Sequence, residues 1–231
     1  MVSHITREAF TIPRTPGELA KYIHETYEHI AANSELKKVA RLHKEPYKTF
    51  LEELMPFGHF CTWKYGDRDD VLCALVRGTP GRDAAVTDIR TGSEHSVEIT
   101  WPIDGRAVVR QNTLVNERGY SDINTFDWDD PSQHKAAIDR TLIIAKKKAV
   151  RDYREPGGST IMFVFDHSLF WDSNPKHVEL LKSLKDQLSA ISLLADNVIL
   201  MLIFGDQKRI IEVKSTEQNA ARDRQVSPGS P

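Results

Sequence analysis

The chain is poor in cysteine, has no long apolar run and carries almost no net charge, and each of these features argues against a class of protein. Two cysteines among 231 residues, with no Cys-x-x-Cys motif, fit a reducing compartment and suggest neither a zinc site nor a redox pair. No stretch approaches the roughly 20 apolar residues that span a bilayer, and the first residues lack the apolar segment of a signal peptide. We therefore expect a soluble, cytoplasmic protein without membrane contact. The net charge of −2 gives no overall attraction for nucleic acid, so such binding requires a local basic patch.

Several signatures of catalysis are also absent. The sequence contains no internal repeat, no nucleophile elbow, no glycine-rich phosphate loop and no His-Glu-x-x-His motif. With 40% hydrophobic residues, the length suits one domain with its own core. We expect a helical extension over residues 1–44, an α/β domain over residues 45–214 and a disordered tail over residues 215–231, which are poor in apolar side chains. The N-terminal helices are a candidate surface for a homodimer.

Apolar periodicity and capping residues predict the order of helices and strands. The predicted helices cover residues 15–32, a short segment that opens at residue 34, residues 46–58, 104–116 and 131–154, and a segment capped by Asn174. The predicted strands cover residues 71–76, 83–89, 96–101, 160–165, 198–204 and 209–213, and residues 59–65 are either a strand or an extended lead-in. The predicted core is thus a helix, three strands, a long helix, a strand, a helix and a strand.

The second and third predicted strands form a β-hairpin whose turn lies at Thr91-Gly92. This turn sets Asp83 opposite Thr100 and leaves Glu98 diagonal to Asp83, and alternation puts all three side chains on one face. Diagonal neighbours lie about 7 Å apart, so both carboxylates can reach one small cation. Two such charges about 5 Å apart repel by roughly 3 kcal/mol at an effective dielectric near 20, and a divalent ion between them reverses the sign. The alternative is that both acids are solvated residues on the outer face of the hairpin.

The order of elements, with Asp83 on one strand and Glu98-Ile99-Thr100 on the next, resembles the PD-(D/E)XK nuclease superfamily over about residues 45 to 205. The resemblance implies an α/β fold of the restriction-endonuclease type, in which an αβββαβ core forms a mixed central sheet flanked by helices. It also implies a nuclease that cleaves DNA with Mg²⁺ or Mn²⁺. In that family's pattern Asp83, Glu98 and the carbonyl of Ile99 bind the metal, and Glu52 or Glu53 completes the site.

One departure from the family pattern concerns the motif lysine, because Thr100 stands in its place. That lysine is thought to orient or deprotonate the attacking water and to neutralise charge at the phosphate, which threonine cannot do. A cation from elsewhere is therefore needed for catalysis. The candidates are Lys48 on the preceding helix, and His134 and Lys135 at the start of the long helix.

Basic residues on the predicted long helix form the best candidate for a nucleic-acid surface. The predicted helix carries the run Lys146-Lys147-Lys148. If the helix reaches residue 154, one narrow wedge of its surface holds Arg140, Lys147, Arg151 and Arg154. Together with Lys135 this wedge is placed to follow a phosphate backbone. The alternative is an ordinary solvated helix face.

Two other functions compete with a nuclease. The missing motif lysine favours a catalytically inactive relative that binds nucleic acid or protein. Asp166-His167, at the end of a predicted strand, is also where an unrelated α/β enzyme gathers its ligands. Strand order separates this last alternative from the nuclease, since the nuclease hypothesis requires the hairpin and residues 160–165 to lie in one sheet.

Overall fold

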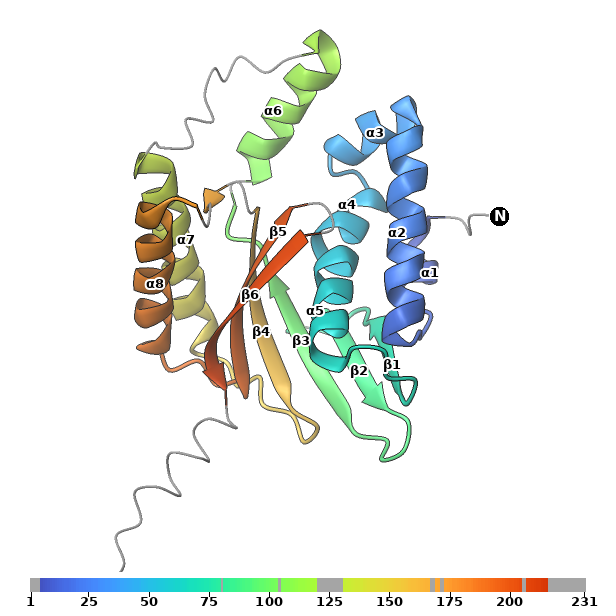
Figure 1. Ribbon diagram of the computed structural model, residues 1–231, viewed down its shortest axis with the longest axis vertical. Helices are drawn as coiled ribbons and strands as arrows, with labels where there is room; N and C mark the ends of the chain where they lie inside the picture. Colours follow the sequence, from blue (N-terminus) through green and yellow to red (C-terminus); the bar gives the residue numbers. More distant parts are fainter. Residues whose placement is uncertain are drawn as a thin grey trace, which may run out of the picture.

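A computed structural model describes residues 5–79, 81–103, 105–119, 131–166, 169–170, 173–204 and 207–215. The described chain is an α/β structure in which helices flank an open, mixed sheet of six strands (Figure 1). The strands are β1 (Val71–Leu75), β2 (Ala84–Asp88), β3 (Glu94–Thr100), β4 (Ser159–Asp166), β5 (Asn197–Phe204) and β6 (Gln207–Ser215). The helices are α1 (Arg7–Phe10), α2 (Pro16–Ala32), α3 (Ser34–Arg41), α4 (Tyr47–Thr49), the π-helical turn η1 (Phe50–Leu54), α5 (Met55–Tyr65), α6 (Gly105–Arg118), α7 (Pro131–Lys148) and α8 (Pro175–Ser189).

The strands lie in the sheet in the same order as in the sequence. The pairs β1–β2, β2–β3 and β5–β6 are antiparallel, whereas β3–β4 and β4–β5 are parallel. Parallel neighbours need crossover connections, and α7 and α8 provide them on one face of the sheet, while α2 and α5 cover the other face (Figure 1). The prediction that the hairpin and residues 160–165 share one sheet is confirmed, because β3 pairs directly with β4.

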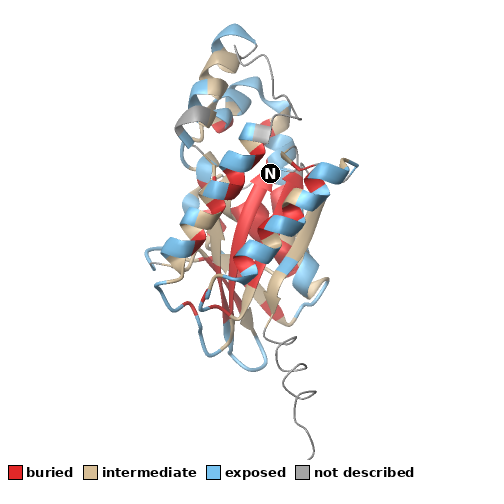
Figure 2. Cartoon of the chain, turned by 90° about the vertical axis from the view of Figure 1, so that its left-hand side faces the viewer, coloured by how far each residue is buried: buried red, intermediate tan, exposed pale blue. Residues whose placement is uncertain are grey.

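Two apolar cores form, one on each face of the sheet. Strand β4 contributes to both, with Met162 and Val164 in the core under α2 and α5 and Phe163 in the core under α7 and α8. This dual burial explains why β4 and β5 are apolar without alternation. Figure 2 shows the buried residues concentrated in the strands between helices whose outer faces are exposed.

The N-terminal helices share the core of the α/β domain. Helix α2 begins where it was predicted, with the Thr15 side chain accepting a hydrogen bond from the backbone N–H of Glu18 and the Glu18 side chain accepting one from the backbone N–H of Thr15. It packs against α5 and β1, and Phe10 and Leu19 lie in the same cluster as Val71. Helix α2 is thus packed on the α/β domain, and the short helix α1 lies before the first predicted helix. No helix among the described residues is long and apolar enough to cross a membrane.

The helix before β1 is longer than predicted. It continues through residues 59–65 as α5 and ends at Tyr65, before Gly66 with its φ of 59°, so the predicted end at Pro56-Phe57-Gly58 and the strand or lead-in after it are wrong. Proline lacks the N–H that would bond the carbonyl of Glu52 in a regular helix. The indole N–H of Trp101 donates to that carbonyl instead, at 2.7 Å, and this bond ties the helix to the end of β3.

Helix α7 is shorter than predicted and ends at Lys148. Beyond it, the N–H of Tyr153 donates to the carbonyl of Leu194 at 2.8 Å, Asp152 forms a parallel bridge with Leu194, and the Tyr153 ring is buried. These contacts with Leu194 hold residues 152 and 153 outside the helix, so α7 ends before them. The predicted helical wedge is therefore wrong for Arg151 and Arg154, which lie in the segment after the helix.

Candidate carboxylate and lysine site

The hairpin register differs from the prediction, because opposed residue numbers sum to 181 instead of 183. Asp88 Oδ1 accepts hydrogen bonds of 2.9 Å from the N–H groups of Arg90 and Thr91, which draws the turn one residue earlier than Thr91-Gly92. Ala84 consequently pairs with Val97. Asp83 lies just before β2, outside the ladder, and its N–H donates to the carbonyl of Val97, so the predicted register that sets Asp83 opposite Thr100 is wrong. The carboxyl groups of Asp83 and Glu98 still lie close enough to interact, because the charge of Glu98 raises the pKa of Asp83.

The pair faces the layer of α7 and α8. In the parallel ladder Glu98 is the partner of Ile161, which lies in the core under those helices. Ile99, the next residue along, packs on the other face. Glu98 therefore projects from β3 toward the C-terminal end of α7.

Asp83 is held in place by backbone contacts to β3. Its N–H donates to the carbonyl of Val97 at 3.0 Å, and its Oδ2 accepts the N–H of Ile99 at 2.7 Å. Burial raises the pKa of Asp83 to about 6, and the negative charge of Glu98 adds to this rise, while the Ile99 N–H and Lys148 oppose it. Near neutral pH the carboxyl group is ionised but destabilised, which is the state that a cation relieves.

Lys148, the last residue of α7, supplies a cation to the pair. Its Nζ donates to Glu98 Oε1, and the Lys148 and Glu98 side chains are only 13% and 14% exposed. The ammonium also lies 5.6 Å from the centre of the Tyr153 ring. Glu98 Oε2 is buried and has no hydrogen-bond partner among the described residues, so one carboxylate oxygen of the site retains its capacity to bind a positive group.

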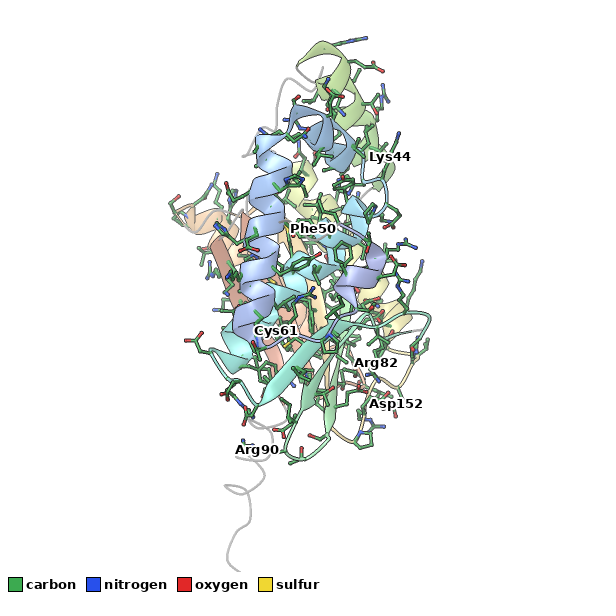
Figure 3. All side chains as sticks on the ribbon, turned by 90° about the vertical axis from the view of Figure 1, so that its right-hand side faces the viewer. Lys44, Phe50, Cys61, Arg82, Arg90 and Asp152 are labelled. Atoms are coloured by element: carbon green, nitrogen blue, oxygen red, sulfur yellow. The ribbon has the colours of Figure 1, made fainter. Side chains whose placement is uncertain are left out.

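Two arginines lie by the residues that precede β2. Arg82, next to Asp83, makes an ion pair with Glu94 at the start of β3, and Figure 3 shows its position on the hairpin ribbon, away from Arg90 at the tip. Arg151 lies over the Tyr153 ring, with its Cζ 5.1 Å from the ring centre. Its guanidinium also packs on Gly81, where a Cβ would overlap it. Arg82, Lys148 and Arg151 together form what we call the basic rim of the site.

The two glutamates of η1 point to different places. Glu52 bonds His43, with 2.6 Å between Oε1 and Nδ1, and lies 4.0 Å from the Lys48 ammonium. Burial raises the pKa of Glu53 to about 7, and the charge of Asp83 is the next largest cause. The helix acid that the carboxylate pair influences is therefore Glu53, whereas Glu52 and Lys48 belong to a separate cluster.

The donor set fits a hard divalent cation only in part. Carboxylate oxygens are the ligands that Mg²⁺ and Mn²⁺ prefer. The carboxylates of Asp83 and Glu98 provide them, and they include the unpartnered Oε2 of Glu98. Within the described ranges, however, no three His, Cys, Asp or Glu side chains gather closely enough to hold a metal ion. The contact that Ile99 makes with the pair is through its N–H.

No printed contact joins the remaining predicted residues to the carboxylate and lysine site. Thr100 is half-buried at the end of β3, and His134 is buried with its ring centre 4.4 Å from that of His177. Lys135 and Lys147 are exposed on α7, and Arg140 donates to the carbonyl of Pro102 at 3.5 Å. Asp166 is exposed at the end of β4, and His167 lies outside the described residues.

A larger cavity, of about 740 Å³, lies at the other end of the sheet, near the starts of β3, β4 and β5. Its polar groups are largely used internally. Arg68 pairs with Asp88, the Nζ of Lys214 donates to the carbonyls of Leu193 and Ala195, and His95 Nε2 lies 2.8 Å from Thr160 Oγ1. Burial lowers the pKa of His95 to about 4, so this ring is a neutral packing residue.

Sequence reasoning had not assigned Lys148 and Arg82 to the site. Lys148 belongs to a run of three lysines, and that run was the only available signal, since the choice among its members depends on where α7 ends. Comparison of the chain with protein-family models, with curated proteins and with solved structures finds no significant match.

Proposed function

We propose that the chain is a divalent-metal-dependent nuclease that hydrolyses phosphodiester bonds of DNA. The observation that carries the proposal is the ion pair of Lys148 with Glu98, since both charges act on the carboxyl group of Asp83. Lys148 provides the positive charge that Thr100 cannot provide, and it does so from helix α7 instead of strand β3. The order α5, β1, β2, β3, α7, β4 also agrees with a restriction-endonuclease-like core, with α6 inserted before α7.

Each residue then has a defined task. Asp83 and Glu98 would hold the ion, with Glu53, on which the charge of Asp83 acts, as a further acid, and the bound ion would supply Lewis-acid chemistry toward the phosphodiester. Asp83 is mostly ionised at neutral pH because its pKa is about 6. Lys148 holds a positive charge and a proton beside the position of the scissile phosphate, where developing negative charge is stabilised. The basic rim contributes Arg82 and Arg151 for neighbouring phosphates.

A cleavage assay tests this proposal. Linear, nicked and single-stranded DNA are incubated with Mg²⁺ or Mn²⁺ and wild-type protein, Asp83→Asn, Glu98→Gln, Lys148→Met or Lys148→Arg. We expect each of the first three changes to lower the rate by at least about 100-fold, a usual loss for one electrostatic group of an active site. Lys148→Arg should keep part of the activity, because the charge remains.

Lys146→Met is the matched control, since it removes an exposed lysine two positions earlier on α7. Its rate should stay within twofold of the wild type. Circular dichroism of every variant checks that the fold is intact. Activity that survives both Asp83→Asn and Glu98→Gln would refute the proposal.

A second candidate is a catalytically inactive module of the same fold that binds nucleic acid. The observation in its favour is the same Lys148 to Glu98 ion pair, because it neutralises a buried acid without a metal. Calorimetric titration with Mn²⁺ separates the two candidates. The nuclease requires Mn²⁺ binding that Glu98→Gln weakens, and the inactive module requires none.

A further inference from the structure

The two edges of the sheet differ in how they are protected. Strand β1 has only five residues, and Arg14 covers its outer side by exchanging backbone hydrogen bonds of 2.7 and 3.1 Å with Cys73. Strand β6 forms the opposite edge and, with nine residues and no proline, is the longest strand of the described sheet. Among the described residues only β5 pairs with it, and no helix crosses in front of it in Figure 1. The outer side of β6 therefore presents a row of backbone groups that another strand can pair with.

The register of β5 and β6 determines which backbone groups point outward. Phe204 pairs with Gln207 across a connection of only two residues, and the pair that closes so short a connection exchanges hydrogen bonds. Hydrogen-bonded and non-hydrogen-bonded pairs alternate along an antiparallel ladder. Every second residue of β6 after Gln207 therefore turns its N–H and C=O away from β5. These outward residues are Lys208, Ile210 and Glu212.

Two opposite charges lie on this edge. Within the part of the chain that the structure describes, neither the ammonium of Lys208 nor the carboxylate of Glu212 has an ion-pair partner. Burial lowers the pKa of Lys208, as expected for a partly buried ammonium with no carboxylate beside it. The two side chains project to the same face, because their positions in the strand differ by four. That difference is about 13 Å along a strand, so the two charges cannot pair within one chain.

We propose that β6 pairs antiparallel with β6 of a second copy of the chain, around a two-fold axis at Ile210. This register places Lys208 of each copy directly opposite Glu212 of the other, so each charge finds its counter-charge. The opposed residues are the outward-pointing ones, and each such pair exchanges two hydrogen bonds. The two sheets of six strands then form one continuous sheet, and neither copy keeps a free β6 edge. The dimer does not depend on the proposed nuclease function.

The charges of β6 favour this register over its neighbours. An axis that is moved by one residue lies at Arg209 or at Ile211. The first position places Arg209 opposite Arg209 of the second copy, and the second brings Lys208 beside Lys214 of the second copy. Like charges directly opposite one another destabilise a strand pair. A lysine on an edge also discourages pairing with unrelated strands, whereas a second copy of β6 carries the matching acid.

Sedimentation equilibrium of the full chain tests the dimer, with the 26.3 kDa mass of one chain as the reference. The wild type should reach twice this mass as its concentration rises to about 100 μM. Lys208→Glu and Glu212→Lys each turn both opposed pairs into like-charged pairs, so each should weaken the dimer at least about tenfold. An equal mixture of the two variants pairs opposite charges again and should regain the wild-type affinity within about threefold. The double variant Lys208→Glu/Glu212→Lys should regain it as well.

Lys37→Glu is the matched control, because it makes the same change of charge at an exposed residue of α3. Its dimer should have the wild-type affinity. Circular dichroism of every variant checks that the fold is intact. Amide hydrogen exchange gives a second measurement, since the N–H of Ile210 points outward in one chain and is hydrogen-bonded in the paired strands. It should exchange more slowly in the dimer than after dilution to the monomer.

Three results would overturn the inference. The first is a wild-type chain that stays monomeric over the whole concentration range. The second is a dimer that neither Lys208→Glu nor Glu212→Lys weakens, because its interface then lies elsewhere, for example on the N-terminal helices. The third is a dimer that both changes weaken and that neither the mixture nor the double variant restores, since the two residues are then not opposite each other. Cleavage of DNA, or its absence, has no bearing on these results.

Discussion

Replacement of Asp83 by asparagine should stabilise the protein at alkaline pH in the absence of divalent ions. The fold raises the pKa of Asp83 from 3.8 to about 6, first through burial and then through the charge of Glu98. Each pKa unit corresponds to about 1.4 kcal/mol, so ionising this carboxyl group costs the fold about 3 kcal/mol. Asparagine cannot ionise, and its side-chain oxygen can still accept the N–H of Ile99.

The sign of the pH dependence follows from proton linkage. Because the pKa is higher in the folded state, folding is favoured by protonation, and the wild type loses this stability as the pH rises from about 4 to about 6. The variant lacks this loss. We expect the two proteins to be equally stable near pH 4 and the variant to be about 2 to 3 kcal/mol more stable at pH 8. For a domain of this size that difference is about 5 to 10 °C in Tm.

Urea unfolding followed by circular dichroism at pH 4, 5, 6, 7 and 8, in EDTA, measures the effect. Asp88→Asn, at the last residue of β2, is the matched control with the opposite sign. The pKa of Asp88 is lowered, mainly because its carboxylate accepts the backbone N–H of Thr91. Replacing this carboxylate by an amide should therefore destabilise the protein at pH 8. The reasoning is refuted if Asp83→Asn is no more stable than the wild type at pH 8, or if the gain is the same at pH 4.

Three further predictions concern other parts of the chain. Trp101→Phe should lower the free energy of unfolding in urea by about 1 to 3 kcal/mol, because the Glu52 carbonyl loses its donor and Pro56 cannot replace it. Trp63→Phe is the control, and at a residue that is 40% exposed it should lower the same free energy by less than about 0.5 kcal/mol. Gly157→Ala should lower stability by about 1 to 3 kcal/mol or more, since its Cβ would overlap the backbone of Glu94, while Gly17→Ala meets no neighbour and should be neutral or slightly stabilising. Glu53→Gln should flatten the fall in stability between pH 4.5 and 7, because the pKa of Glu53 is raised to about 7 in the fold. An unchanged slope in Glu53→Gln would show that this acid is not buried beside Asp83.

The face of the hairpin was predictable, and its register was not. Alternation places Asp83 and Glu98 on the same side in any register shifted by an even number of residues. The register itself depends on Asp88, whose side chain bonds two backbone N–H groups and moves the turn. Two arrangements that differ by two residues bury the same apolar face, so the hydrophobic pattern could not separate them.

Helix ends were the other limit of sequence reasoning. Pro56 is usually a stop signal, and here the neighbouring Trp101 indole satisfies the carbonyl that proline leaves unpaired. The end of α7 is set by Tyr153, which is buried through a contact with the distant Leu194. Because that contact is tertiary, the sequence indicated a run of three lysines without indicating that Lys148 is the member that reaches Glu98.

The separation in sequence between Lys148 and the acids has a consequence for the order of folding. Asp83 and Glu98 are 15 residues apart, whereas Lys148 follows Glu98 by 50 residues. Hairpins form in about 1 to 10 μs, and contacts across longer loops form later. We therefore expect the hairpin to assemble with its two negative charges together before α7 docks and brings the compensating ammonium. Salt that screens this early repulsion should accelerate the hairpin step and have little effect on the later arrival of α7.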